Sequence, residues 1–357
     1  MKKKVLAAMM VAVMTMAMVT GCGNASHATT AETTKTETVE AETESAGTTY
    51  KVGIVQYVDD ASLNQIEAAI EKELDAKAAE LGVTFNYADY TFNGQADSTT
   101  INQIAAELVA DQVDVIIPIA TPTAMIMQAA TEENQIPVVF SAVSDPVSTG
   151  LVASMEAPGA NVTGTSDALD TEAVMNLILA ANPDTKTVGL LYDKGQDSST
   201  TAIAAAKSYL EGKGISCVEK TGTTNDEISL AADALVAAGV DAVFTPTDNT
   251  VMTAELAIYE KFAQANIPHY GGADSFALNG AFCGYGVNYV ELGTATADMA
   301  VEVLTEGKVP AELAVRTLDN GIATINTETA AAMNLDYSMF KDMCEDVLET
   351  VTAKEFE

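Results

Sequence analysis

Tryptophan is absent from this sequence, and basic residues are scarce. The 357 residues include no Trp, two His, and 17 Lys and Arg against 51 Asp and Glu, which gives a formal net charge of −34. A protein that binds the phosphates of nucleic acid needs a basic surface, so this composition excludes that role. The charge also argues against electrostatic attachment to anionic lipid. Sugar sites commonly stack pyranose rings on Trp, so a sugar ligand is disfavoured as well.

Cysteine is too scarce for a disulfide framework. If Cys22 has a separate role, an odd number of thiols is left: Cys217, Cys283 and Cys344. Cys217 and Cys283 lie in runs typical of strands, where a free thiol packs as a small apolar group. The two His are far apart in the sequence and no Cys pair has ligand spacing, which disfavours a zinc site and a His-based catalytic triad. We expect no metal and no cofactor.

The chain begins with a basic, then an apolar, then a small-residue segment. Residues 2–4 are Lys and 5–19 are largely apolar, the layout of a secretory signal peptide. The sequence Val-Thr-Gly-Cys at 19–22 resembles the bacterial lipobox, in which cleavage before the Cys leaves a thiol that carries lipid. The alternatives are an ordinary signal peptide with a chance Cys or a transmembrane anchor, but a span needs ~20 apolar residues.

We therefore predict a signal peptide at 1–21, lipid such as palmitate on Cys22, and a position on the extracytoplasmic face of a bacterial cell membrane. Cleavage would remove three Lys and shift the charge from −34 to −37. Residues 22–49 are mostly Thr, Glu, Ala and Ser, which cannot build a core, so we predict a disordered tether.

From Tyr50 onward, β-branched runs alternate with amphipathic segments. Residues 51–55 predict a buried strand, and 63–81 predict a helix that ends at Gly82. This alternation indicates a parallel α/β sheet. We expect further strands at 83–87, 113–118 and 136–140, with helices at 98–110 and from Met125 to near Asn134.

The pattern then repeats. Residues 187–191 match 51–55, 240–244 match 113–117, and the sequence Asn-Ile-Pro at 266–268 matches Gln-Ile-Pro at 135–137. Periodicity alone makes all α/β repeats look alike, but matched Val-Asp and Ile-Pro pairs in the same order favour a duplication. Two Rossmann-like lobes would place their strand ends around one cleft, where a ligand binds and favours closure.

Several motifs occur in an order that resembles a known family. They are VGIVQY at 52–57, IATP at 119–122, FSAVSDP at 140–146, PGANVTGTS at 158–166, PTDNT at 246–250 and YVELG at 289–293. Over residues 50 to about 335 the chain resembles the substrate-binding lipoproteins of ABC importers with the type I periplasmic-binding fold. Within these it is similar to the branch of tryptophan- and tyrosine-type amino-acid binding proteins.

The resemblance implies three crossovers between the lobes. Lobe one would be 50–164 and 288–317, and lobe two 165–287 and 318–357; the residues alone suggest a simple split near 165. It also implies a monomer that is not an enzyme, and that captures a small molecule for a membrane permease and its ATPase subunits.

Polar residues at the expected strand ends indicate the ligand. Thr121 suits a helix N-cap and Pro122 the first helical position, so free N–H groups with the hydroxyls of Thr121 and Thr123 could hold a carboxylate. Asp248 and Asp274 could hold an ammonium group, although acidic residues there could also be helix caps. An α-amino acid, with aromatic ones favoured, fits both ends. The expected ligand-binding residues are Gln56, Tyr57, Thr121, Thr123, Ser141, Asp145, Tyr192, Thr247, Asp248, Asn249, Asp274 and Tyr285.

Three alternatives remain open. Asp and Asn side chains could equally bind a nucleoside, a purine or another small polar ligand. A lipoprotein that senses a ligand for a membrane kinase would have the same sequence features. A two-lobed racemase would need paired cysteines on equivalent strands, but Cys217 and Cys283 both belong to the second repeat.

Overall fold

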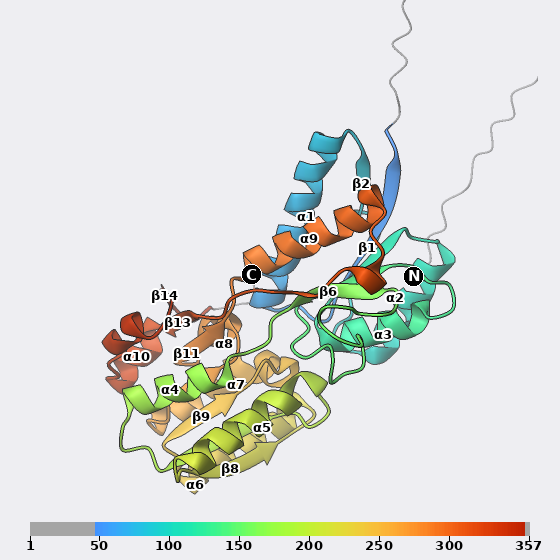
Figure 1. Cartoon of the computed structure of the whole chain (residues 1–357). Coiled ribbons are helices and arrows are strands. Elements are labelled where there is room, and N and C mark those ends of the chain that lie inside the picture. Colours follow the sequence, from blue (N-terminus) through green and yellow to red (C-terminus); the bar gives the residue numbers. More distant parts are fainter. Residues whose placement is uncertain (1–46, 354–357) are drawn as a thin grey trace, which may run out of the picture. The chain divides into compact units, whose positions relative to one another are not determined.

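The computed structural model describes residues 47–353 and contains two largely parallel sheets (Figure 1). The predicted signal peptide, Cys22 and the tether up to residue 46 lie outside the described residues. The first sheet has the order β12-β6-β5-β4-β1-β2, with β3 paired to β1. Its strands are β1 (Thr49–Gln56), β2 (Thr84–Asn86), β3 (Thr91–Asn93), β4 (Val115–Ile119), β5 (Val138–Phe140), β6 (Val162–Ser166) and β12 (Arg316–Thr317).

The second sheet has the order β14-β13-β11-β10-β9-β7-β8. Its pairs are parallel except β11–β13, which is antiparallel. The strands are β7 (Thr187–Tyr192), β8 (Ser216–Thr221), β9 (Ala242–Thr245), β10 (His269–Gly271), β11 (Cys283–Gly286), β13 (Ile322–Asn326) and β14 (Asp346–Thr350). The predicted α/β fold with two parallel-sheet lobes is confirmed.

Helices connect the strands of each sheet. The first lobe carries α1 (Ala61–Leu81), α2 (Ser98–Ala110), α3 (Thr121–Thr131) and α9 (Tyr289–Glu306). The second carries α4 (Thr171–Ala181), α5 (Asp197–Gly212), α6 (Asn225–Ala238), α7 (Asn249–Gln264), α8 (Asp274–Leu278) and α10 (Thr327–Met333). Short 3₁₀ turns lie at Pro310–Glu312 and Ser338–Asp342.

The first sheet is buried on both faces, as its continuous apolar strands require. Val52 and Ile54 of β1 pack in the cluster that contains Leu63 and Ile66 of α1. Val55, on the other face, packs in the cluster formed with α2 and α3. Because side chains alternate along a strand, one run of apolar residues supplies both layers. Helices α1 and α9 lie side by side on the first of these faces (Figure 1).

The two lobes repeat the same local hydrogen bonds. Asp114 accepts a hydrogen bond from the backbone of Lys51 at 2.7 Å, and Asp241 accepts them from Lys186 and Thr187 at 2.8 and 2.9 Å. Each Asp also donates its own N–H back to the neighbouring strand. The matched Val-Asp pairs of the sequence thus fasten equivalent strands in the two lobes.

The chain passes between the sheets in three places. These are residues 167–170 between β6 and α4, 287–288 between β11 and α9, and 318–321 between β12 and β13. Asn320 ties the first and third segments together, because its Nδ2 donates to the Ala168 carbonyl at 2.6 Å and its Oδ1 accepts from the Asp170 N–H at 3.2 Å. Just before the first segment, Gly164 has a φ of 155°, and a Cβ there would overlap the carbonyl oxygen of Phe140.

Several boundaries differ from the sequence prediction. β1 begins at Thr49, which pairs with Thr84, so the predicted tether ends earlier than residue 49. Helix α3 begins at Thr121, and its N-cap is Ala120 rather than the predicted Thr121; Ala120 has non-helical backbone angles and Thr121 already belongs to the helix. Of the predicted strand thiols, Cys283 is buried and Cys217, on the edge strand β8, is half-buried.

Candidate functional site

A small cavity is lined by residues of both lobes. Its lining comes from the first lobe, from the segment after β6 and from the second lobe: Ser62, Leu63, Ala120, Thr121, Ala142, Ser144, Asp167, Ser198, Thr247, Asn249, Met252, Ala273 and Tyr289. We call this the inner cavity. Its volume is about 10 Å³, room for roughly one water molecule. A larger ligand therefore requires the two walls to move apart.

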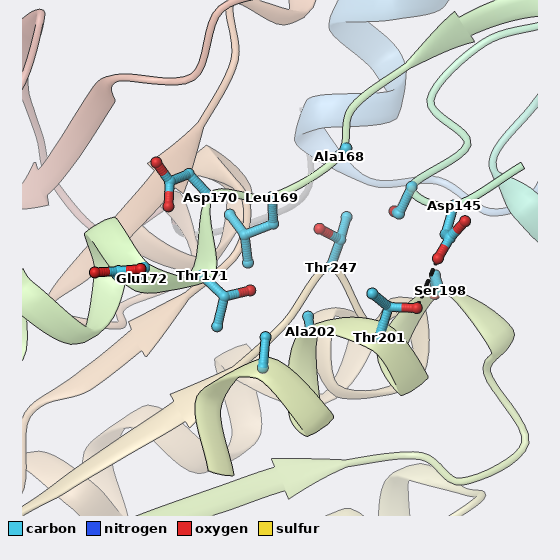
Figure 2. A pocket seen from close by; sticks show the side chains of 12 residues that line it. Asp145, Ala168, Leu169, Asp170, Thr171, Glu172, Ser198, Thr201, Ala202 and Thr247 are labelled. Atoms are coloured by element: carbon cyan, nitrogen blue, oxygen red, sulfur yellow. Dashed lines mark hydrogen bonds between the residues drawn. The ribbon is translucent and has the colours of Figure 1, made fainter. Parts of the chain in front are cut away.

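A second, outer cavity shares Ser144, Ser198 and Thr247 with the inner one. Its volume is about 190 Å³. Ala168, Leu169, Ala202 and Ala205 form an apolar part of its wall, and three carboxylates line it, from Asp145, Asp170 and Glu172. Figure 2 shows Asp145 and Thr201 closing one side of it, where the Thr201 hydroxyl donates to Asp145 Oδ2 at 2.6 Å.

Two hydroxyls at the start of α3 have no partner among the described residues, and one of them, that of Thr121, belongs to a residue that lines the inner cavity, whereas Thr123 lines neither cavity. Thr121 and Thr123 are buried at the start of α3, and their Oγ1 atoms make no hydrogen bond within residues 47–353. Pro122 lies between them, and no side chain caps this helix. The first N–H groups of a helix lack intrahelical partners and carry partial positive charge. This end of α3 can therefore accept an anionic group such as a carboxylate.

The backbone next to these hydroxyls is strained. Ala120 has φ 78° and ψ 152°, a region that is essentially restricted to glycine. Ala142, after β5, also has a positive φ of 56°. Both line the inner cavity. Backbone strain of this kind concentrates at binding sites, because the surrounding structure must maintain it.

Two sequence-predicted acids are already fully bonded. Asp248 caps α7, with Oδ1 accepting from the Val251 N–H at 3.0 Å, while Oδ2 accepts from the Asp193 N–H at 2.8 Å and the Ser199 hydroxyl at 2.6 Å. Burial nevertheless raises the pKa of Asp248 to about 6. Its side chain does not line either of the two cavities.

Asp274 joins the two lobes instead. Its Oδ1 accepts from the Ser62 hydroxyl at 2.5 Å and its Oδ2 from Gln65 Nε2 at 2.8 Å, both on α1. Burial raises the pKa of Asp274. Burial, and then the charge of Asp274, raise the pKa of the neighbouring Asp60 to about 7.

Asp167 has an incomplete set of partners. It lies directly after β6, is 5% exposed and lines the inner cavity. Oδ1 accepts from the Ser144 hydroxyl at 3.0 Å, and no described side chain donates to Oδ2. Burial raises the pKa of Asp167 to about 6. No Lys, Arg or His lines either of the two cavities.

Other predicted residues support the walls rather than line the inner cavity. Gln56 donates to Asn64 and to the Val58 carbonyl, and Ser141 bonds to Thr296 at 2.8 Å. Tyr192 donates to Glu219 at 2.8 Å, and Tyr285 is buried in the second-lobe core. Tyr57, half-buried after β1, packs against a core cluster that includes residues of both lobes.

Thr247 and Asn249 do line the inner cavity. The Thr247 hydroxyl donates to the Gly272 carbonyl at 3.2 Å, and Asn249 donates to Gln196 at 3.1 Å. Of the predicted set, the structure thus brings together Thr121, Thr247 and Asn249 around the inner cavity and Asp145 around the outer one.

Sequence reasoning missed Ser62, Ser144, Asp167, Ser198 and Tyr289. Ser198 also has an unpartnered hydroxyl among the described residues. Ser144, Asp167 and Ser198 all follow a strand, the signal that identified Thr121 and Asp248.

Within the described part of the chain, no group of three or more His, Cys, Asp and Glu is arranged to hold a metal ion. No helix there is long and apolar enough to cross a membrane.

Comparison with known proteins agrees with this architecture. A tyrosine-binding protein of Clostridioides difficile (strain R20291) is 32% identical over 338 residues, which cover 93% of each chain. A Streptococcus pneumonia crystal structure in complex with L-Trp has a TM-score of 0.77 at 28% identity, covering 84% of this chain and all of that one. A ligand-free, open substrate-binding protein of Clostridium difficile has a TM-score of 0.64 at 30% identity, covering 85% of this chain and all of that one.

The family described as ABC transporter substrate binding protein matches residues 51–340. That match includes strands of both sheets, with β14 outside it, and every residue that lines the two cavities. The chain therefore belongs to the ABC transporter substrate-binding protein family.

Proposed function

We propose that this protein captures an α-amino acid between its lobes and delivers it to a membrane permease. The observation that carries the proposal is the uncapped start of α3, where two buried Thr hydroxyls have no partner among the described residues. Leaving a buried hydroxyl unpaired costs ~1–3 kcal/mol. A ligand carboxylate that accepts from these groups would recover that cost.

The proposed ligand is a zwitterion. Hydroxyl and N–H groups of α3 would donate to its carboxylate without any basic side chain, and the acidic side chain that lines the inner cavity, Asp167, would hold its ammonium group. Ser62, Ser198, Thr247 and Asn249 would complete the wall. We propose that the other sequence-predicted residues position these groups and do not contact the ligand.

The side chain of the ligand would extend into the outer cavity. Leu169, Ala202 and Ala205 offer an apolar surface to an aromatic ring, and the carboxylates of Asp145 and Asp170 could accept from a phenol. The relatives support an aromatic amino acid, since one is named tyrosine-binding and another was crystallised with L-Trp.

The same proposal covers location and chemistry. The protein would act outside the cell membrane as a monomer, anchored by lipid on Cys22 after removal of residues 1–21, and would pass its ligand to the permease without any covalent step. Loss of metabolic palmitate label in Cys22→Ser, with release of the protein from membranes, would support the anchor. Equal labelling of the variant would contradict it.

A thermal-shift screen tests the ligand class. We expect the chain from Gly23 onward, which keeps every described element, to gain stability with L-tyrosine or L-tryptophan. Ligand at 100 times Kd adds ~2.7 kcal/mol to the free energy of unfolding. Nucleosides and sugars serve as comparison compounds. Stabilisation by nucleosides or sugars alone would overturn the amino-acid proposal.

A further inference from the structure

Among the described residues, Asp167 is the one acid that lines the inner cavity, and only one of its carboxylate oxygens accepts from a side chain. Asp145 accepts from Ser148 and Thr201, and Asp274 accepts from Ser62 and Gln65. These contacts occupy both oxygens of each group. In Asp167 only Oδ1 accepts from a side chain, that of Ser144. Asp60 has an unpartnered Oδ2 within the described residues but does not line the inner cavity.

The position of Asp167 is as distinctive as its bonding. It is the first residue of the segment 167–170, where the chain leaves the first sheet for the second. Ser144, which donates to Oδ1, lines both cavities. A buried carboxylate is costly unless it is paired, and the linings of the two cavities contain no cationic side chain to pair with it.

We propose that Asp167 binds the ammonium group of the ligand through Oδ2 and so selects α-amines over the corresponding deaminated acids. This inference rests on the proposed function and adds to it the residue that would distinguish an amino acid from an acid without the amine. The hydrogen bond from Ser144 holds the carboxylate by Oδ1, and Oδ2 has no side-chain donor of its own among the described residues. Because 167–170 is also a crossover between lobes, amine binding acts directly on a segment that must flex when the walls separate.

The charged groups near Asp167 give the interaction a pH dependence. Burial, and then the charges of Asp167, Asp274 and Asp60, raise the pKa of Tyr289 on α9. These neighbours are acids or a phenol, so they cannot neutralise Asp167. An ammonium group would, and it would lower the pKa of Asp167 from about 6. Binding near pH 6 should therefore release protons, whereas binding at pH 8 should release few.

The experiment compares L-tyrosine with 3-(4-hydroxyphenyl)propanoic acid, which lacks only the amine. Calorimetry of the wild-type chain and Asp167→Asn measures both affinities. Hydrogen bonds to charged groups are worth ~1.5–3 kcal/mol, or roughly tenfold to 150-fold in Kd. We expect Asp167→Asn to lose roughly that factor for L-tyrosine and to change less than about threefold for the deaminated acid.

The matched control is Asp319→Asn. Asp319 is exposed on another crossover segment, so this variant removes the same charge without touching the cavity lining, and it should bind both compounds as wild type does. Retained binding of the deaminated acid by Asp167→Asn shows that the variant is folded. Proton release, measured at pH 6 in two buffers of different ionisation enthalpy, should fall in Asp167→Asn.

The outcomes separate the two proposals. If the wild-type chain binds L-tyrosine and Asp167→Asn binds it equally well, the inference about Asp167 is wrong and the proposed function stands. If both compounds lose affinity equally in Asp167→Asn, the residue does not select the amine. If the wild-type chain binds neither L-tyrosine nor L-tryptophan, the proposed function fails and the inference fails with it.

Discussion

The turn from β4 to α3 and the turn from β9 to α7 occupy equivalent places in two similar lobes, yet their chemistry is opposite. In the first, Ala120 provides no capping side chain, and the hydroxyls of Thr121 and Thr123 stay unpartnered among the described residues. In the second, Asp248 caps the helix and accepts three hydrogen bonds. One helix start is open to an external anion, and the other is already filled by the chain's own carboxylate.

This difference explains how a duplicated fold can make one asymmetric site. Two open helix starts would both attract anions, because each carries partial positive charge. With α7 capped by Asp248, a ligand carboxylate is favoured only at α3. In the proposed arrangement the other end of the ligand is bound by Asp167 in the crossover segment, and the second lobe closes over it. The following predictions test that division, beginning with the largest effect.

Asp248→Ala should destabilise the protein most. It would leave the Asp193 and Val251 N–H groups and the Ser199 hydroxyl without their acceptor, and each unpaired buried donor costs ~1–3 kcal/mol. Because removal of a buried charge offsets part of this, we expect a net loss of about 3 kcal/mol. Urea unfolding of the free protein measures it. An unchanged free energy of unfolding would mean that α7 is not fastened by this carboxylate.

The contribution of Asp248 to the pH dependence of the free protein should be of similar size and has a definite sign. The pKa of Asp248 is about 6 in the folded state, against ~3.9 in an unfolded chain. Its contribution to stability is therefore fully present below about pH 4 and is lost as the pH rises through 6, about 3 kcal/mol in total. Asp60 and Asp167 act in the same direction.

Asp248→Asn isolates this contribution. The amide keeps an oxygen for the cap but cannot ionise, so the stability of the variant should fall less between pH 4.5 and 8. Chemical unfolding at several pH values checks the difference. The same slope in wild type and variant would show that Asp248 is not the titrating group.

The sequence predicts the scaffold well because its signals are local. The helix at Ser98–Ala110 and the Gly82 cap follow from neighbouring residues, and the matched Asp114 and Asp241 identify the repeat. The hydrogen bonds that Asp248 accepts cannot be predicted from neighbouring residues, because two of the donors, Asp193 and Ser199, lie 55 and 49 residues away in the sequence. In the sequence, an acidic residue at a strand end gives the same pattern whether or not its carboxylate already accepts hydrogen bonds from the protein.

The strained backbone at the N-cap of α3 could not be predicted from the sequence either. A positive φ is normally marked by glycine, and here the residue is Ala120. Asp167 carried the right signal, an acid directly after a strand, but it stands in a crossover whose position depends on the fold of the whole chain.

Thr121→Val should separate binding from stability. Its hydroxyl has no partner among the described residues, so its removal costs no internal hydrogen bond, while affinity for an amino acid should fall about tenfold. Thr250→Val in α7 is the matched control, because the Thr250 hydroxyl donates to Asp193 at 2.8 Å. That variant should lose about 1 kcal/mol of stability and keep its affinity. If Thr121→Val lost stability and kept its affinity while Thr250→Val lost affinity and kept its stability, the proposed difference between the two helix starts would be contradicted.

Ala120→Gly should give the smallest change, and of the opposite sign in stability. Glycine adopts φ 78° and ψ 152° without the steric penalty that alanine pays there. Relief of that strain should raise the free energy of unfolding by about 1 kcal/mol, after subtraction of the greater entropy of glycine in the unfolded chain. Ala142→Gly, at a milder φ of 56°, should gain less. Since Ala120 holds Thr121 in place, the stabilised variant should also bind an amino acid less tightly, which calorimetry on the same sample would detect. Greater stability with unchanged affinity would mean that the strain at this turn serves no purpose in holding the ligand's carboxylate.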